Sequence, residues 1–211
     1  MSNEVKTKEK VDMDPKYITK LTVTLLVTCI IVAGLLGLVN GVTAGPIAQI
    51  NQQKTEQAMA EVVSDPSSFQ AVAELPQAAV DAATAAGGTL TELYDGQGAG
   101  YVLKVVASGS QGNIEMMVGV DGDGVVTGVS IVDNSETAGI GSKVMENEPL
   151  ASGTGVLDQF AGKSLQTFEV TKTSPSADNQ IAAISGATFT SKAVTGAVNA
   201  AVYFAENCIA Q

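Results

Sequence analysis

Residues 101–132, YVLKVVASGSQGNIEMMVGVDGDGVVTGVSIV, carry the clearest β-structure signal in this chain of 211 residues. They contain three runs of strand length that are rich in β-branched residues, at 101–107, 114–120 and 125–132. Glycine-containing turns separate the runs, so the pattern predicts a three-stranded antiparallel meander. The second turn, DGDG at 121–124, opens like a calcium-binding loop. However, Val132 stands where such a loop needs a glutamate, and we interpret the segment as a hairpin turn.

The residues after the meander predict helices and one more strand. A loop at 133–143 leads into a polar stretch that we expect to be helical to about Phe160, and Thr167–Lys172 is typical of a strand. The last element is a helix from Phe189 to about Glu206, with small and apolar residues on one face: Ala193, Val194, Ala197, Val198, Ala201, Val202 and Ala205. Such a face can dock closely on a sheet. We therefore expect an α+β domain, with a small antiparallel sheet packed by helices.

An apolar run lies before this domain, at Leu21–Thr43, inside a segment without charged residues that extends to Gln53. It is long enough to cross the hydrocarbon core of a bilayer, which needs about 20 residues. Five lysines precede the run and only Lys54 follows closely, so the positive-inside rule predicts a cytoplasmic N-terminus and an extracytoplasmic C-terminal domain. A cleaved signal peptide is the alternative, but the run is longer than the roughly 7–15 apolar residues typical of one.

These signals divide the chain into four expected segments. They are a cytoplasmic tail, a transmembrane helix, a helical connection and an extracytoplasmic domain, at residues 1–20, 21–43, 44–90 and 91–211. Within the connection, residues 47–64 predict a helix that continues from the membrane and ends at Asp65-Pro66. The alanine-rich residues 71–90 predict either a short helix or a poorly ordered connection.

The charge and composition exclude several classes of function. The formal net charge is −11, every basic residue is lysine, and there is no histidine. An acidic chain without arginine lacks the positive field and the bidentate donors that bind phosphate backbones, so we expect no nucleic-acid partner. Without histidine the chain lacks the commonest general base and the commonest zinc ligand. This composition excludes histidine-containing hydrolytic triads and histidine-containing metal sites, and we expect no metal site.

Residues 185–191, SGATFTS, stand at the expected start of the last helix. A glycine turn there would bring hydroxyl groups and free backbone N–H groups to a helix N-terminus, a place that favours anions and above all phosphate. The simpler interpretation is that Thr188 only caps the helix. A second glycine-rich segment, NSETAGIG at 134–141, follows the meander. By itself it indicates a plain connector.

Both segments resemble motifs of one family. SGATFTS resembles the flavinylation motif of the FMN-binding domains in Rnf complexes and Na+-translocating quinone reductases. In that family a flavin transferase joins the FMN phosphate to the threonine of Gly-Ala-Thr as a phosphoester, and the matching residue is Thr188. The segment ETAGIG is similar to the family's Glu-Thr-Pro-Gly-Leu-Gly loop beside the flavin, with Ala138 and Ile140 as replacements. The family also places an Asp three residues before the motif, where this chain has Ala182, and the nearest acidic residue upstream is Asp178.

The resemblance implies that residues 91–211 form an FMN-binding domain and that these two motifs supply its cofactor site. The residues that it implies are Thr188 for the covalent bond, with Ser185, Gly186, Ala187, Thr190, Ser191, Glu136, Thr137, Gly139, Ile140 and Gly141 around the cofactor. Lys172, at the end of the preceding strand, either stabilises charge on reduced flavin near N1 or is a solvated surface lysine.

The size and motif spacing are more similar to the Rnf G-type subunit than to the longer C-type subunit of the quinone reductase. The resemblance therefore implies a membrane-anchored electron-transfer subunit of an ion-translocating ferredoxin:NAD+ oxidoreductase, without turnover of its own. Its expected partners are the other membrane and peripheral subunits, membrane lipid, and a flavin transferase during maturation. The alternatives are a C-type quinone reductase subunit, a stand-alone extracytoplasmic FMN carrier, and a non-redox sensor or binding module in which SGAT is only a helix cap.

Overall fold

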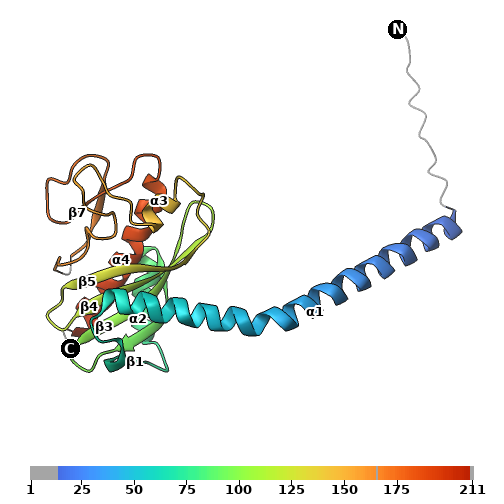
Figure 1. The fold of residues 1–211 in the computed structure, drawn as a ribbon, viewed down its shortest axis with the longest axis horizontal. Coiled ribbons are helices and arrows are strands. Elements are labelled where there is room, and N and C mark those ends of the chain that lie inside the picture. Colours follow the sequence, from blue (N-terminus) through green and yellow to red (C-terminus); the bar gives the residue numbers. More distant parts are fainter. Residues whose placement is uncertain (1–13, 165, 210–211) are drawn as a thin grey trace, which may run out of the picture. The chain divides into compact units, whose positions relative to one another are not determined.

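The computed structural model describes residues 14–164 and 166–209 and divides into two compact units, residues 1–50 and 51–211 (Figure 1). The first unit consists of most of helix α1, Pro15–Val62, which contains the predicted transmembrane segment. Residues 1–13 of the expected cytoplasmic tail lie outside the described residues. Within the described part, α1 is the one helix that is long and apolar enough to cross a membrane.

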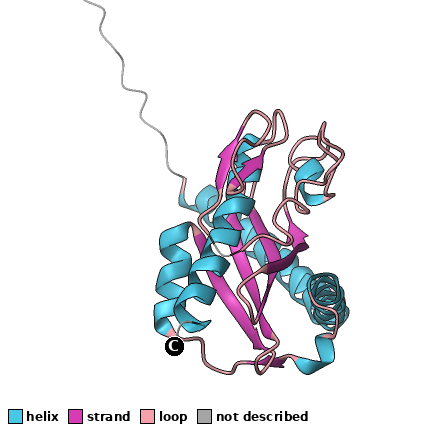
Figure 2. Ribbon diagram, turned by 90° about the vertical axis from the view of Figure 1, so that its left-hand side faces the viewer, coloured by secondary structure: helices cyan, strands magenta, loops and turns pink. Residues whose placement is uncertain are grey.

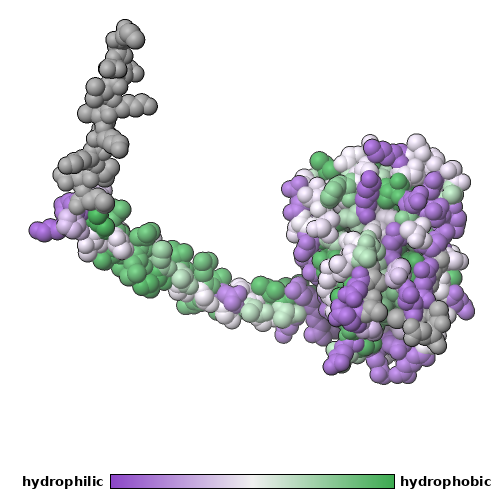
Figure 3. All heavy atoms as spheres, turned by 180° about the vertical axis from the view of Figure 1, so that it is seen from behind, coloured by the Kyte–Doolittle hydropathy of each residue, from purple (hydrophilic) through white to green (hydrophobic). Residues whose placement is uncertain are grey.

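The surface of α1 suits an apolar medium along this segment, as the green band in Figure 3 shows. Its leucine, isoleucine and valine side chains are exposed. The threonine hydroxyls donate to backbone carbonyl oxygens four residues earlier, at 2.8–2.9 Å, in Thr19, Thr22, Thr24, Thr28 and Thr43. Such internal bonds satisfy the hydroxyl donors without water.

The second unit is built on a five-stranded antiparallel sheet in the order β1-β2-β3-β4-β5. The strands are β1 Gln70–Ala71, β2 Gly88–Asp95, β3 Gly100–Ser108, β4 Asn113–Asp121 and β5 Val126–Asn134. Strands β3 to β5 confirm the predicted meander. Strand β2 was not predicted, because the pair Gly87-Gly88 is typical of a break between elements. Gly88 lies within the strand instead, where an added Cβ would collide with Val105 and approach helix α4, Thr188–Ile209.

Two helices cover one face of the sheet (Figure 2). They are α2, Gln77–Ala86, and α4, Thr188–Ile209, the latter confirming the predicted last helix. The apolar face of α4 is buried, including Val194, Ala197, Val198 and Ala201. Small side chains there let the helix backbone come close to the sheet, and this contact forms the main core.

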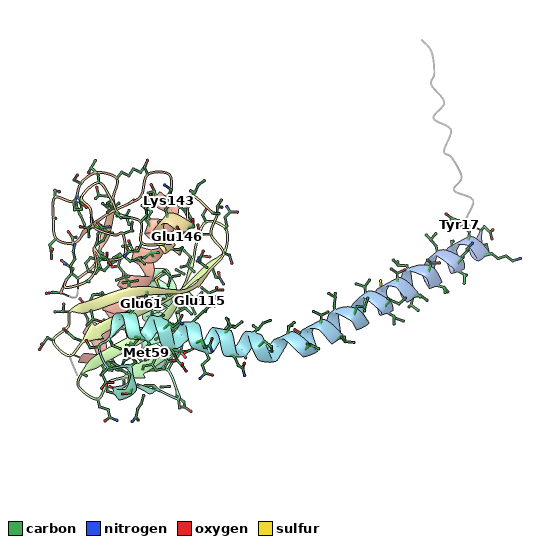
Figure 4. The ribbon with its side chains drawn as sticks, in the orientation of Figure 1. Tyr17, Met59, Glu61, Glu115, Lys143 and Glu146 are labelled. Atoms are coloured by element: carbon green, nitrogen blue, oxygen red, sulfur yellow. The ribbon has the colours of Figure 1, made fainter. Side chains whose placement is uncertain are left out.

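The last turns of α1, residues 51–62, pack on the opposite face of the sheet, where Figure 4 labels Met59 and Glu61. Met59 and Val62 are buried against strand residues. Thr127 donates to the Val62 carbonyl at 2.5 Å, and Ser130 donates to the Glu61 carboxylate at 2.6 Å. The short 3₁₀ helix η1, Pro66–Ser68, follows, so the helix ends near the predicted Asp65-Pro66.

The segment between the sheet and α4 is mostly irregular. Helix α3 comprises only Ser142–Met145, so the prediction of helix to about Phe160 is wrong. The reason lies in NEPLASGTG at 147–155, where Gly153 has a φ of 85° and Pro149 and Gly155 form an isolated bridge. Strand β6, Glu169–Thr171, lies within the predicted strand and pairs in parallel with β7, Gln180–Ala182.

Candidate functional site

The turn into α4 presents Thr188 at the first position of the helix. The amide of Ala187 donates to the Ile184 carbonyl at 3.0 Å, and the amide of Ser191 donates to the Ala187 carbonyl at 2.9 Å. Gly186 has a φ of 86° with open space around it, so its backbone conformation is what favours glycine there. Because helix hydrogen bonding begins at Ser191, the amides of the three residues before it are the free donors of a helix N-terminus.

The hydroxyls of this turn differ in their partners. Thr190 is buried and donates to Glu136 Oε2 at 2.7 Å, and Ser191 is buried and donates to the Ala187 carbonyl at 3.0 Å. The half-buried Thr188 hydroxyl makes no hydrogen bond to another residue in the described part of the chain. Thr188 is also inside the helix rather than before it, so the interpretation of Thr188 as a simple N-cap is wrong. Its hydroxyl is therefore available for chemistry.

The loop that carries ETAGIG is hydrogen-bonded to this turn through Glu136, whose carboxylate accepts the Thr190 hydroxyl. Thr137, Gly139 and Ile140 are exposed. The Thr137 carbonyl accepts the amides of Ile140 and Ser142, both at 3.2 Å, and Gly139 has a φ of 77°. The structure thus brings Glu136 and Thr190 together, whereas these three loop residues make their contacts within the loop.

A cavity of about 720 Å³ adjoins the same turn. Its wall contains parts of 148–154, 172–175 and 180–185, including the predicted residues Lys172 and Ser185. This volume is within the range of about 300–1,000 Å³ that is typical of small-molecule sites. The wall combines apolar and neutral polar residues with Lys172, Lys163 and Glu148, and Ser185 begins the turn that leads to Thr188. Lys163 is paired with Asp178 at 3.9 Å.

Two residues of the cavity wall were missed in the sequence. Gln159 pairs with both backbone groups of Ala182, donating to its carbonyl at 3.1 Å and accepting its amide at 2.8 Å. Lys163 donates to the Asp178 carbonyl and lies 5.9 Å from the centre of the Phe168 ring. Gln159 falls in the stretch that we expected to be helical and Lys163 just after it. Gln159 also donates to the nearby Val156 carbonyl at 3.2 Å, but its partner Ala182 is 23 positions away and the Lys163 partner Asp178 is 15 positions away. Local sequence carried no signal for either contact.

Comparisons with known proteins identify the family of this domain. The family described as the FMN-binding domain matches residues 109–203. The chain is 36% identical to the G subunit of the Na(+)-translocating ferredoxin:NAD(+) oxidoreductase complex of Acetobacterium woodii, over 96% of this chain and 99% of that protein. It is 32% identical to the G subunit of the proton-translocating ferredoxin:NAD(+) oxidoreductase complex of Clostridium ljungdahlii, over 90% of this chain and 93% of that protein.

Among solved structures, the chain is similar to the C subunit of the Na(+)-translocating NADH-quinone reductase from Parabacteroides distasonis, with 20% identity and a TM-score of 0.46. That similarity covers 74% of this chain and 92% of the other. The family assignment depends on the G-subunit relatives, because they align with both the apolar helix and the domain that carries Thr188. With more than 30% identity across almost the full length of these relatives, the chain belongs to the G-subunit family of ion-translocating ferredoxin:NAD+ oxidoreductase (Rnf) complexes.

Proposed function

We propose that this chain is the membrane-anchored electron-transfer subunit of an Rnf-type ferredoxin:NAD+ oxidoreductase, and that it carries FMN as a phosphoester on Thr188. The observation that carries the proposal is the free Thr188 hydroxyl at the start of α4, inside the residues that match the FMN-binding domain. Bound FMN supplies one-electron chemistry, and the chain supplies its position and electrostatic surroundings.

The residues around Thr188 fit such a cofactor. A phosphoester there keeps a negative charge, which the free amides and the dipole of the α4 N-terminus stabilise. The adjoining cavity has apolar residues in its wall that suit a flat ring, and Lys172 supplies positive charge there. A positive group near the ring favours the reduced, more negative form of a flavin.

Attachment exchanges a phosphoanhydride bond for a phosphoester bond. Thr188 Oγ1 gives up its proton and bonds to the flavin-side phosphorus of a flavin dinucleotide, and the nucleotide monophosphate leaves when its bond to that phosphorus breaks. We assign this step to a flavin transferase, because the described residues around Thr188 offer no free general base: the carboxylate of Glu136 already accepts three hydrogen bonds.

The anchor in this proposal is the apolar part of α1, with the N-terminus in the cytoplasm and the FMN-binding domain, proposed as residues 91–211, outside. The lysines before the run support this orientation through the positive-inside rule. The remaining membrane and peripheral subunits of the complex would donate and accept the electrons. Membrane lipid would surround the exposed apolar side chains of α1.

The test is the intact mass and in-gel flavin fluorescence of the chain purified from its own membranes, beside two variants. Thr188→Val removes the hydroxyl with little change of volume, and Thr188→Ser keeps a hydroxyl at the same position. We expect the wild type and Thr188→Ser to carry one FMN less one water, and Thr188→Val to carry none. An unmodified wild-type chain would contradict the covalent site and favour a non-redox binding module. Copurification with several multi-span subunits would distinguish a member of a complex from a stand-alone carrier.

A further inference from the structure

We propose that Glu136 is a positioning residue: its carboxylate fastens the first turn of α4 to the β3–β4 hairpin and so holds Thr188 in the geometry in which it is modified. The inference rests on the proposed function of Thr188 for its consequence, but the fastening itself is a property of the unmodified chain. It gives Glu136 a role different from the direct flavin contact that the resemblance implies.

The carboxylate of Glu136 joins two elements that are distant in sequence. Oε1 accepts the backbone amides of Ser110 and Gln111, at 2.6 and 3.2 Å, in the turn between β3 and β4. Oε2 accepts the hydroxyl of Thr190 at 2.7 Å, in the first turn of α4. Hydrogen bonds to a charged acceptor are stronger than those between neutral groups. The Glu136 side chain therefore holds the β3–β4 hairpin and the first turn of α4 together.

The Glu136 carboxylate occupies space that side chains at positions 109 and 141 would fill, and both positions are glycine. An added Cβ on Gly109, in the hairpin, would overlap Glu136 Oε1, and an added Cβ on Gly141, in the loop, would overlap Glu136 Oε2. The amide of Gly109 also donates to the Gly112 carbonyl at 2.8 Å, which keeps the hairpin tight around the carboxylate. Glycine at both positions is thus explained by contact with Glu136, without any contact to a flat ring.

The Glu136–Thr190 hydrogen bond restrains Thr188 because both threonines lie in the first turn of α4. Thr190 is two residues after Thr188 in the same turn, so holding its side chain limits the movement of the whole turn. A transfer reaction on the Thr188 hydroxyl needs the attacking oxygen in line with the leaving group, and a misplacement of about 1 Å can reduce a rate by about 100-fold. We therefore expect loss of the Glu136 contacts to slow the modification of Thr188.

The variant Glu136→Gln distinguishes the effect of the hydrogen bonds at position 136 from the effect of the negative charge. The glutamine carbonyl oxygen can accept the amides of Ser110 and Gln111, while its NH₂ group donates to the Thr190 hydroxyl, which then acts as an acceptor. Glu136→Gln should consequently keep the connection, whereas Glu136→Ala removes it. Thr190→Ser and Thr190→Val form the matched pair on the other side of the contact.

The experiment measures the initial rate of flavin incorporation into the full-length chain in detergent micelles, with a purified flavin transferase, Mg²⁺ and flavin adenine dinucleotide. We expect Glu136→Ala and Thr190→Val each to be about tenfold slower or more, and Glu136→Gln and Thr190→Ser to remain within about threefold of wild type. The double variant Glu136→Ala/Thr190→Val should be no slower than the slower single variant, because both single changes remove the same Glu136–Thr190 hydrogen bond.

A second readout is amide hydrogen exchange of the unmodified chain. Glu136→Ala should increase exchange in both the 109–112 turn and the 185–191 turn, and Glu136→Gln should restore the protection. Wild-type rates in Glu136→Ala would overturn the positioning role, as would a Glu136→Gln rate as low as that of Glu136→Ala. Absence of flavin from the wild type would refute the proposed function instead, and unchanged exchange in Glu136→Ala would then refute the fastening independently.

Discussion

Asn199 on α4 is expected to stabilise the segment that carries β6 and Lys172. Its side chain pairs with both backbone groups of Phe168, accepting the amide at 2.8 Å and donating to the carbonyl at 3.0 Å. Phe168 is 2% exposed, so water has little access to these groups. Asn199→Ala would leave a buried donor and a buried acceptor unpaired, each at a cost of about 1–3 kcal/mol. With partial relaxation of the segment, we expect a loss of about 2–4 kcal/mol.

Thermal unfolding of the full-length protein in detergent, followed by near-ultraviolet circular dichroism, can measure this loss. For a domain of this size class, 1 kcal/mol corresponds to about 2–4 °C, so the midpoint should fall by about 4–16 °C. Asn207→Ala is the matched control on the same helix, because Asn207 is exposed and, among the described residues, its side chain donates to the Tyr203 carbonyl one turn earlier. Both changes place alanine in α4, so the difference in helix propensity cancels.

The difference in unfolding midpoint between these two variants tests whether the Asn199 hydrogen bonds stabilise the domain. Equal midpoints for Asn199→Ala and Asn207→Ala would show that the paired amide side chain adds no stability. A large loss in Asn199→Ala should also loosen the cavity wall at Lys172, which follows β6 directly. Faster hydrogen exchange at residues 168–172 in the variant would report that second effect.

Three further predictions concern the cavity and the sheet. Ala182→Asp should raise the initial rate of flavin incorporation, because it restores the acid of the related motif in the cavity wall; an equal or lower rate would contradict this. Lys172→Gln should lower the reduction potential of bound flavin in a potentiometric titration, less so at high salt, and an unchanged potential would mean that Lys172 is only a solvated lysine. Burial and the hydrogen bond to Glu92 raise the pKa of Tyr94 above its ordinary value of 10.0. Above about pH 10 Tyr94 therefore loses its proton only in the unfolded chain, and the stability of the folded chain falls as pH rises. Tyr94→Phe should show a shallower decline of the unfolding midpoint between about pH 9 and 11, and an identical slope would refute this.

The sequence by itself determined the elements whose signals are local. The apolar run within α1, the three strands of the meander and the helix that begins at Thr188 each follow from residue type and spacing along one segment. The two motifs at 136–141 and 185–191 were also visible, because they depend on short residue patterns. Periodicity and turn chemistry act between near neighbours, so one sequence is enough to read them.

Only the tertiary structure decided the features that depend on distant partners. Gly88 belongs to a strand because Val105 and α4 lie against it, and the residues up to Phe160 form turns rather than helix. Glu136 meets Ser110 and Thr190 at separations of 26 and 54 residues, and Gln159 meets Ala182 at a separation of 23. A sequence pattern does not indicate which polar side chain will hydrogen-bond to a buried backbone group. Folding fixes that choice, because an unpaired buried group costs more free energy than most local preferences supply.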